Sequence, residues 1–171
     1  MKLYRGKRVF NREGMTRGEA SVVVQDVVSN GPTGRGLTAE AGLGEARPLT
    51  HIPYHSPDGL EWGYLGSGPA DLALAILADY FDEPPELVLA ALRSMWAPRS
   101  KAAAFHQSFK ERFVVRERRD EWELHSDDIE AWLQTSSIRT RLCDLAREDA
   151  ELTQLRRLEQ EGERADADAA D

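Results

Sequence analysis

The chain has 171 residues and a formal net charge of -8, and its 41% hydrophobic and 30% charged residues are typical of one globular domain with extensions. No apolar run approaches the roughly 20 residues of a membrane span, and the basic N-terminus lacks the apolar core of a secretion signal, so we expect a cytoplasmic protein that does not contact membranes. A single cysteine, Cys143, excludes an intrachain disulfide and every multi-cysteine metal site.

The first two strands are expected within residues 3–10 and 20–28, which have the β-branched content of a hairpin. Residues 29–50 are rich in glycine and proline, which predicts a flexible insertion.

A turn, a strand and a helix are predicted in the middle of the chain. Residues 56–59, Ser-Pro-Asp-Gly, favour a type I turn. It joins an extended segment at 52–55 to a strand at 60–64, in which Trp62 shares a buried face with its apolar neighbours. Ser67 or Gly68 is expected to cap a central, apolar helix at 69–81.

The second half of the folded part is expected to be mainly helical, with helices at 86–96 and 101–112. A core stripe follows from phenylalanines spaced by four. Strands are predicted at Val114–Val115 and Trp122–Leu124, and Ser126 is expected to cap the next helix. Phe105, Phe109 and Phe113 form the stripe. In the helix that Ser126 is expected to cap, the residues that face inward are Ile129, Trp132 and Leu133.

The predicted fold class is α+β, with a small antiparallel sheet packed against three to four helices and a C-terminal helical extension. Residues 1–135 form the domain, with the insertion at about 29–50, followed by an amphipathic helix at 136–162 and a disordered acidic tail at 163–171.

The charge is concentrated at the C-terminal end. Residues 144–171 hold 10 acidic residues against 4 arginines, a net of -6, whereas residues 1–143 hold 20 acidic against 18 basic residues, a net of -2. No broad basic surface is indicated, so a macromolecular partner is more plausibly a protein than a nucleic acid.

Four blocks in this order resemble a small uncharacterised domain family of bacterial and phage-type proteins: Tyr4-Arg5-Gly6, His55 to Ala70, Gln107-Ser108-Phe109-Lys110 and Trp122-Glu123-Leu124. The family pattern for the long block is His-Ser-Pro-x-Gly-Phe-Glu-Trp-Gly-Tyr-x-Gly-Ser-Gly-Pro-Ala. Leu60 replaces the usual Phe, and Leu65 stands where Gly is common. The resemblance covers residues 2 to about 133. It implies a fold unit and a mobile-element setting, and it supplies no catalytic residues.

The candidate chemical groups are few. His51 and His55 could bind a metal together with Asp58 or Glu61, but hydrogen bonds that stabilise the turn are the commoner role, so we predict no metal and no cofactor. The helix start at Ser67 and Gly68 offers backbone amides to an anion, although capping alone explains it.

Two functions remain open. The leading hypothesis is a non-enzymatic interaction module of a small bacterial or mobile-element accessory protein. The alternative is a small enzyme, a hydrolase or a nucleic-acid-processing activity, in which His106 and Lys110, one helical turn apart, join His55 and Glu61 for acid–base work. Surface positions are the commoner explanation for His106 and Lys110. Convergence of the four side chains in one concave pocket would favour the enzyme, and dispersion the module.

Overall fold

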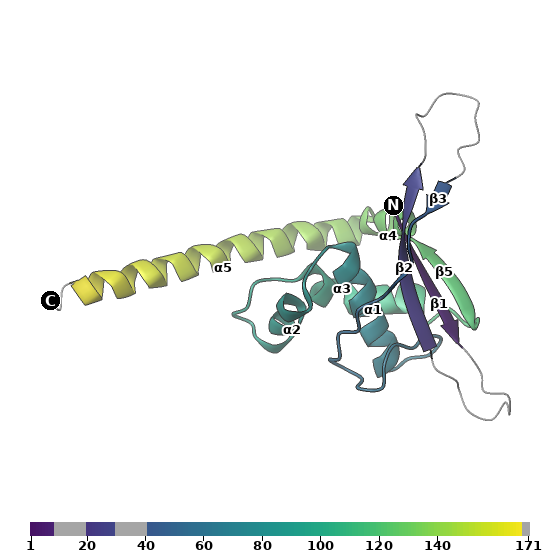
Figure 1. Ribbon diagram of the computed structural model, residues 1–171. Helices are drawn as coiled ribbons and strands as arrows, with labels where there is room; N and C mark the ends of the chain where they lie inside the picture. Colours follow the sequence, from purple (N-terminus) through teal and green to yellow (C-terminus); the bar gives the residue numbers. More distant parts are fainter. Residues whose placement is uncertain (9–19, 30–40, 169–171) are drawn as a thin grey trace, which may run out of the picture.

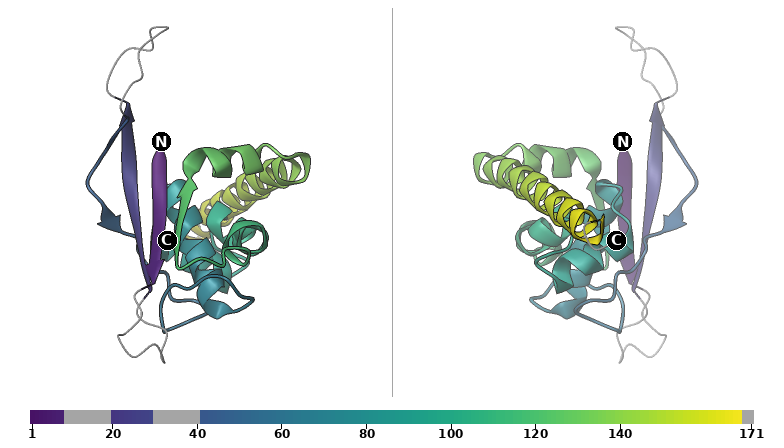
Figure 2. Two further views of the ribbon diagram at one scale, coloured as in Figure 1. Left: turned by 90° about the vertical axis from the view of Figure 1, so that its right-hand side faces the viewer. Right: turned by 90° about the vertical axis from the view of Figure 1, so that its left-hand side faces the viewer.

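The computed structural model describes residues 1–8, 20–29 and 41–168 (Figure 1). Its α+β architecture is the predicted one: a curled antiparallel sheet, helices on one face of that sheet, and a long C-terminal helix that projects from the body (Figures 1 and 2). Among the described residues, no helix is both long and apolar enough to cross a membrane.

The sheet is built around β1 (Lys2–Arg8), which pairs antiparallel with β2 (Ala20–Ser29) on one side and with β5 (Glu121–His125) on the other. The predicted hairpin of the first two strands is therefore confirmed. Two short strands, β3 (Ala41–Leu43) and β4 (Arg47–Pro48), both pair with β2. Both lie within residues 29–50, which were predicted to be a flexible insertion. They form strands because the edge of β2 offers backbone hydrogen-bond partners, which the glycine content of the segment does not reveal.

Gly6 shows how closely the sheet packs at its centre. It pairs with Trp122 across the β1–β5 ladder, and a β-carbon at position 6 would lie 2.2 Å from the indole Nε1. Only glycine leaves room for the tryptophan ring, which covers this part of the strand and joins the core.

Helix α1 (Ser67–Tyr80) is the central element of the helical layer, as predicted. All its residues from Gly68 to Ala78 are buried, because its apolar side chains face the sheet on one side and other helices on the other. The neighbouring elements are α2 (Pro85–Arg93), α3 (Lys101–Phe109) and α4 (Ser126–Leu133). The phenylalanine stripe is confirmed as core: Phe105 and Phe109 are buried, and Phe113 packs against the cluster.

Three local predictions are wrong. Residues 60–64 form no strand, because Gly63 adopts a left-handed φ of 83° with its Cα against the carbonyl of Glu117. Val114 ends a π-helical turn, η1 (Lys110–Val114), that continues α3, so β5 pairs with β1 and not with this segment. The predicted helix at 86–96 ends at Arg93, because Ser94 is extended.

The predicted caps also differ. Gly66 occupies the N-cap position of α1, and Ser67 is an exposed first helical residue whose side chain caps nothing. At α4 the cap position belongs to His125, and the hydroxyl of Ser126 instead accepts a hydrogen bond from the backbone N–H of Lys2 at 2.9 Å. This bond ties the start of α4 to the start of β1.

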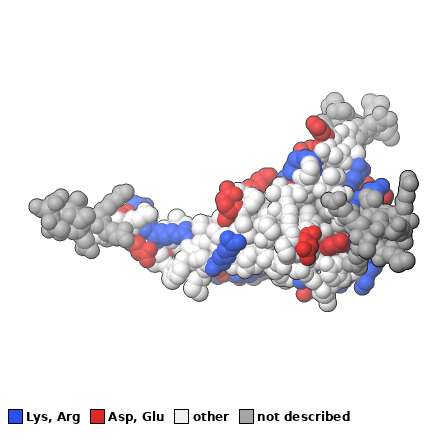
Figure 3. Space-filling model, turned by 60° about the horizontal axis from the view of Figure 1, so that its bottom comes forward, with Lys and Arg blue, Asp and Glu red and all other residues white. Residues whose placement is uncertain are grey.

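Helix α5 (Ser136–Asp168) is longer than predicted and reaches into the stretch expected to be a disordered tail. Alanine, glutamate and arginine favour helix there even without a core to pack on. Its first turns belong to the core: Leu145 is buried, Ile138 and Leu142 pack beside it, and Asp149 Oδ1 accepts the backbone N–H of Arg99 at 2.9 Å. The rest of α5 projects from the domain (Figure 1). On the face shown in Figure 3, basic and acidic side chains are interspersed.

Candidate functional site

The centre of the site is Asp71, a residue on the second turn of α1 with an exposed fraction of 0%. Its carboxylate accepts backbone N–H bonds from Tyr54 at 3.3 Å and from His55 and Ser56 at 2.9 Å each. The loop before α1 is therefore wrapped around one buried negative charge. Sequence reasoning missed this role, and the signal for it was that Asp71 and Asp79 are the only charged residues of an otherwise apolar helix.

Two histidines complete the shell of Asp71. His55 Nδ1 lies 2.8 Å from Asp71 Oδ1, and His51 Nε2 lies 3.3 Å from Oδ2. Burial alone would raise the pKa of Asp71, but the hydrogen bonds from His55, Ser56 and His51 hold that pKa below its ordinary value. An ionised carboxylate only accepts hydrogen bonds, so Nδ1 of His55 carries a proton and Nε2 is turned away from Asp71.

His106 lies beside His55, with the ring centroids 5.1 Å apart. The expectation of a surface position is wrong for His106, which is buried under the loop that Asp71 organises. Its Nδ1 lies 2.8 Å from the carbonyl oxygen of Ala103, which fixes the proton there and leaves Nε2 as an acceptor. Burial lowers the pKa of His106 and so favours the neutral ring.

Gln107 joins these groups to Lys110. Its Nε2 donates to His106 Nε2 at 2.8 Å and lies 3.5 Å from His55 Nε2. Its Oε1 accepts from Lys110 Nζ at 2.6 Å. The structure thus brings together three of the predicted candidates, His55, His106 and Lys110, through an exposed glutamine that the prediction did not include.

Glu61 and Gly68 lie in a separate group. Glu61 Oε2 accepts from Arg8 Nη2 at 2.7 Å, and Arg8 also donates to the carbonyl of Trp62 at 2.6 Å and stacks on that indole at 4.1 Å. Gly68 packs against the stem of Glu61, where a β-carbon would lie 2.8 Å from the Glu61 Cβ. These contacts anchor the segment before α1, with Glu61 held by an arginine and not by a histidine.

The metal site weighed for His51 and His55 is not assembled, because both rings face Asp71 and Asp58 is exposed. No group of three His, Cys, Asp or Glu side chains suited to a metal ion occurs in residues 1–8, 20–29 and 41–168.

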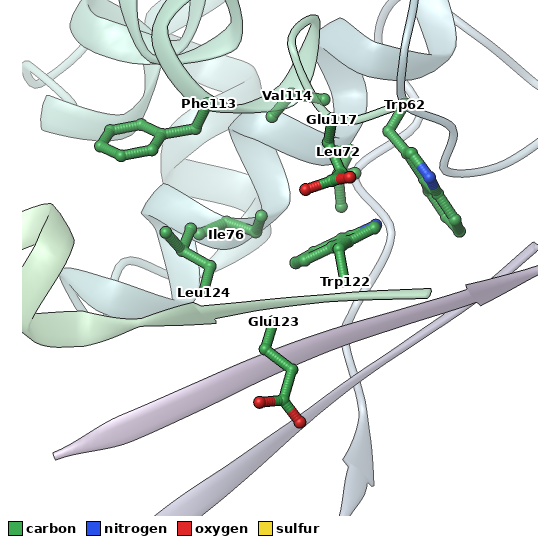
Figure 4. A pocket seen from close by; sticks show the side chains of 9 residues that line it. All are labelled: Trp62, Leu72, Ile76, Phe113, Val114, Glu117, Trp122, Glu123 and Leu124. Atoms are coloured by element: carbon green, nitrogen blue, oxygen red, sulfur yellow. The ribbon is translucent and has the colours of Figure 1, made fainter. Parts of the chain in front are cut away.

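A small cavity of about 110 Å³ lies between the helices and β5 (Figure 4). Its walls are mainly apolar, and the carboxylate of Glu117 points toward the side of the cavity that Trp122 lines (Figure 4). Arg119 binds both oxygens of Glu117, at 2.9 and 2.7 Å, and thereby lowers the pKa of that carboxyl. The Nε1 edge of Trp122 is turned toward the perpendicular ring of Trp62, whose π face is a weak acceptor. None of the six predicted candidates lines this cavity.

A different surface carries large exposed apolar side chains. Met95 and Trp96, in the loop after α2, are 70% and 67% exposed, and Leu155 and Leu158 on α5 are 52% and 56% exposed. Trp96, Leu155 and the half-buried Leu152 line one shallow groove, and Arg156 donates to the carbonyl of Trp96. We call the groove formed by Trp96, Leu152 and Leu155 the Trp96 surface; Met95 and Leu158 are its exposed apolar neighbours in the sequence.

Comparison with known proteins gives one match. A model of the family described as "Family of unknown function (DUF6166)" matches residues 4–86 and 82–135 of the chain. No curated protein and no solved structure matches it.

Proposed function

The chain belongs to DUF6166, a family of unknown function, and we propose that it is a non-enzymatic interaction module that binds another protein through the Trp96 surface. The observation that carries this proposal is the exposure of Trp96 next to Leu155, on a helix that projects from the domain. Contiguous exposed apolar groups rimmed by charges are typical of protein-binding sites, and tryptophan is enriched among the residues that dominate binding energy.

The charge around this surface selects the partner. The groove itself is lined by one cation, Arg156, and one anion, Glu159. From Glu148 to Glu161, α5 carries five acidic residues against two arginines, a net of -3, and Glu148 and Glu161 are paired with arginines. A second copy of the chain would bring like charges together, and the phosphates of a nucleic acid would be repelled. We therefore infer a protein segment that presents apolar residues flanked by Lys and Arg, such as a basic amphipathic helix laid against the groove.

The enzyme hypothesis has less support. It requires His55, Glu61, His106 and Lys110 to converge, whereas Glu61 is bound by Arg8 in a separate cluster. Within the histidine cluster, Gln107 binds both His106 and Lys110, as in a structural network. Both observations support the module.

The setting of the protein is part of the same proposal. The resemblance of the His55-to-Ala70 block supports an accessory protein of a bacterium or mobile element, and a cytoplasmic location is part of this proposal.

Heteronuclear NMR titration of the full chain tests the proposal. We would compare two amphipathic peptides of equal apolar content, one with Lys and one with Glu on the polar face. We expect the Lys peptide alone to shift the Trp96 indole signal and the backbone signals of residues 152–158, with an effect that weakens as salt is added.

Matched variants distinguish a specific surface from general stickiness. Trp96→Ser and Leu155→Ser should each abolish the shifts, whereas Leu65→Ser, which removes a leucine that is 74% exposed elsewhere, should leave them unchanged. Equal binding of both peptides, or binding that survives both substitutions, would contradict the proposal.

A further inference from the structure

Two imidazoles from distant parts of the chain present their Nε2 atoms to one point. His55 is oriented by the carboxylate of Asp71 at 2.8 Å, and His106 by the carbonyl of Ala103 at 2.8 Å, in both rings through Nδ1. Both Nε2 atoms then face the same amide nitrogen of Gln107, at 3.5 and 2.8 Å. A carboxylate or carbonyl behind Nδ1 is the usual support of a histidine whose Nε2 binds a metal ion.

We propose that His55 and His106 together bind one divalent transition-metal ion through their Nε2 atoms, at the place that the amide of Gln107 fills in this structure. Imidazole nitrogen suits Zn²⁺, Ni²⁺ and Cu²⁺, whereas Mg²⁺ and Ca²⁺ prefer oxygen ligands. Gln107 is exposed, so its side chain can turn into solvent and uncover both nitrogens.

The geometry requires a small closure. Zinc–imidazole bonds are about 2.0–2.1 Å long. From distances of 2.8 and 3.5 Å to the common point, His106 Nε2 must approach it by about 0.7–0.8 Å and His55 Nε2 by about 1.4–1.5 Å. The backbone N–H and the ring of His55 are both held by Asp71 Oδ1, so the movement of His55 is a rotation of its ring about this anchor. Because the described residues supply no third His, Cys, Asp or Glu ligand, water completes the coordination and the affinity is modest.

Lys110 opposes the metal in two ways. Its ammonium group is a nearby positive charge, and its 2.6 Å bond to Gln107 Oε1 holds the glutamine over the histidines. Lys110→Gln therefore strengthens metal binding, an effect that a purely structural histidine pair would not show.

Isothermal titration of the full chain with ZnCl₂ and NiCl₂ near neutral pH tests the site. We expect one equivalent of either metal to bind, no binding of MgCl₂, and a loss of at least about tenfold in affinity for His55→Gln or His106→Gln. His125, an exposed residue of β5 outside this cluster, is the matched control: His125→Gln should retain the wild-type affinity. Thermal unfolding of each variant establishes that it is folded.

A second measurement needs no variant. Long-range ¹H–¹⁵N correlation spectra of the wild-type imidazoles should show Zn²⁺ shifting Nε2 of His55 and His106 and leaving His125 unchanged. Absence of both heat and shifts at millimolar Zn²⁺, or shifts confined to His51 or His125, would overturn the proposal. Either result leaves the Trp96 surface untouched, because none of these histidines belongs to it.

Discussion

Replacement of Asp71 by Asn tests whether one buried carboxylate organises the loop before α1. Its Oδ2 accepts the backbone N–H groups of Tyr54 and Ser56, and its Oδ1 binds the backbone and ring of His55. Asparagine retains one oxygen and turns an NH₂ group toward the donors of the other. If Oδ2 is the atom lost, two backbone donors lose their partner. At about 1–3 kcal/mol for each unsatisfied buried donor, we expect the free energy of unfolding to fall by roughly 2–6 kcal/mol.

Urea denaturation followed by circular dichroism measures this loss. Asp58→Asn is the matched control, because it makes the same change at an exposed position in the same loop, and it should alter the free energy of unfolding by less than about 0.5 kcal/mol. A denaturation midpoint of Asp71→Asn equal to that of the wild type would refute the role assigned to Asp71.

Three further predictions concern stability. Gly6→Ala places a methyl group against the indole that covers it and should cost roughly 1–3 kcal/mol of unfolding free energy, measured in urea; an unchanged midpoint would be inconsistent with the packing. Burial lowers the pKa of His106 below its ordinary value of 6.5, so the buried neutral ring contributes to the folding stability above pH 6.5, and this contribution is lost as the pH falls further. Calorimetry should show a melting temperature that drops between about pH 6.5 and 5, with a smaller drop in His106→Asn. Truncation after Gln160 should leave the melting temperature unchanged, whereas truncation after Leu133 removes the buried Leu145 and should lower it; equal temperatures for both would place α5 outside the core.

Local sequence patterns predicted much of the fold. The β-branched runs predicted the hairpin of β1 and β2, and the apolar composition of α1 predicted its central place. The spacing of Phe105 and Phe109 likewise predicted a buried stripe. Each of these inferences depends on residues close together in sequence, where propensity and periodicity are informative.

The errors concern contacts between distant residues. Trp62 is buried, as expected, but it lies in a loop and not in a strand. Its ring contacts Arg8 and Trp122, which are distant in the sequence. The contact between His55 and His106 was not predicted for the same reason: 51 positions separate them in the sequence, and the packing of α1 against α3 brings them together. Asp71 gave a weak signal because a buried carboxylate and a solvated one look alike in sequence.

Site-specific photocrosslinking tests the central claim, that a basic protein partner binds the Trp96 surface, most directly. The crosslinker p-benzoylphenylalanine would replace Leu158 in the full chain in its native host, with replacement of Leu65 as the control position. The account predicts a product at position 158 that Trp96→Ser removes, with mass spectrometry placing the crosslink in a partner segment where Lys or Arg flank apolar residues. The same product from position 65, a product that persists in Trp96→Ser, or none from position 158 would contradict it.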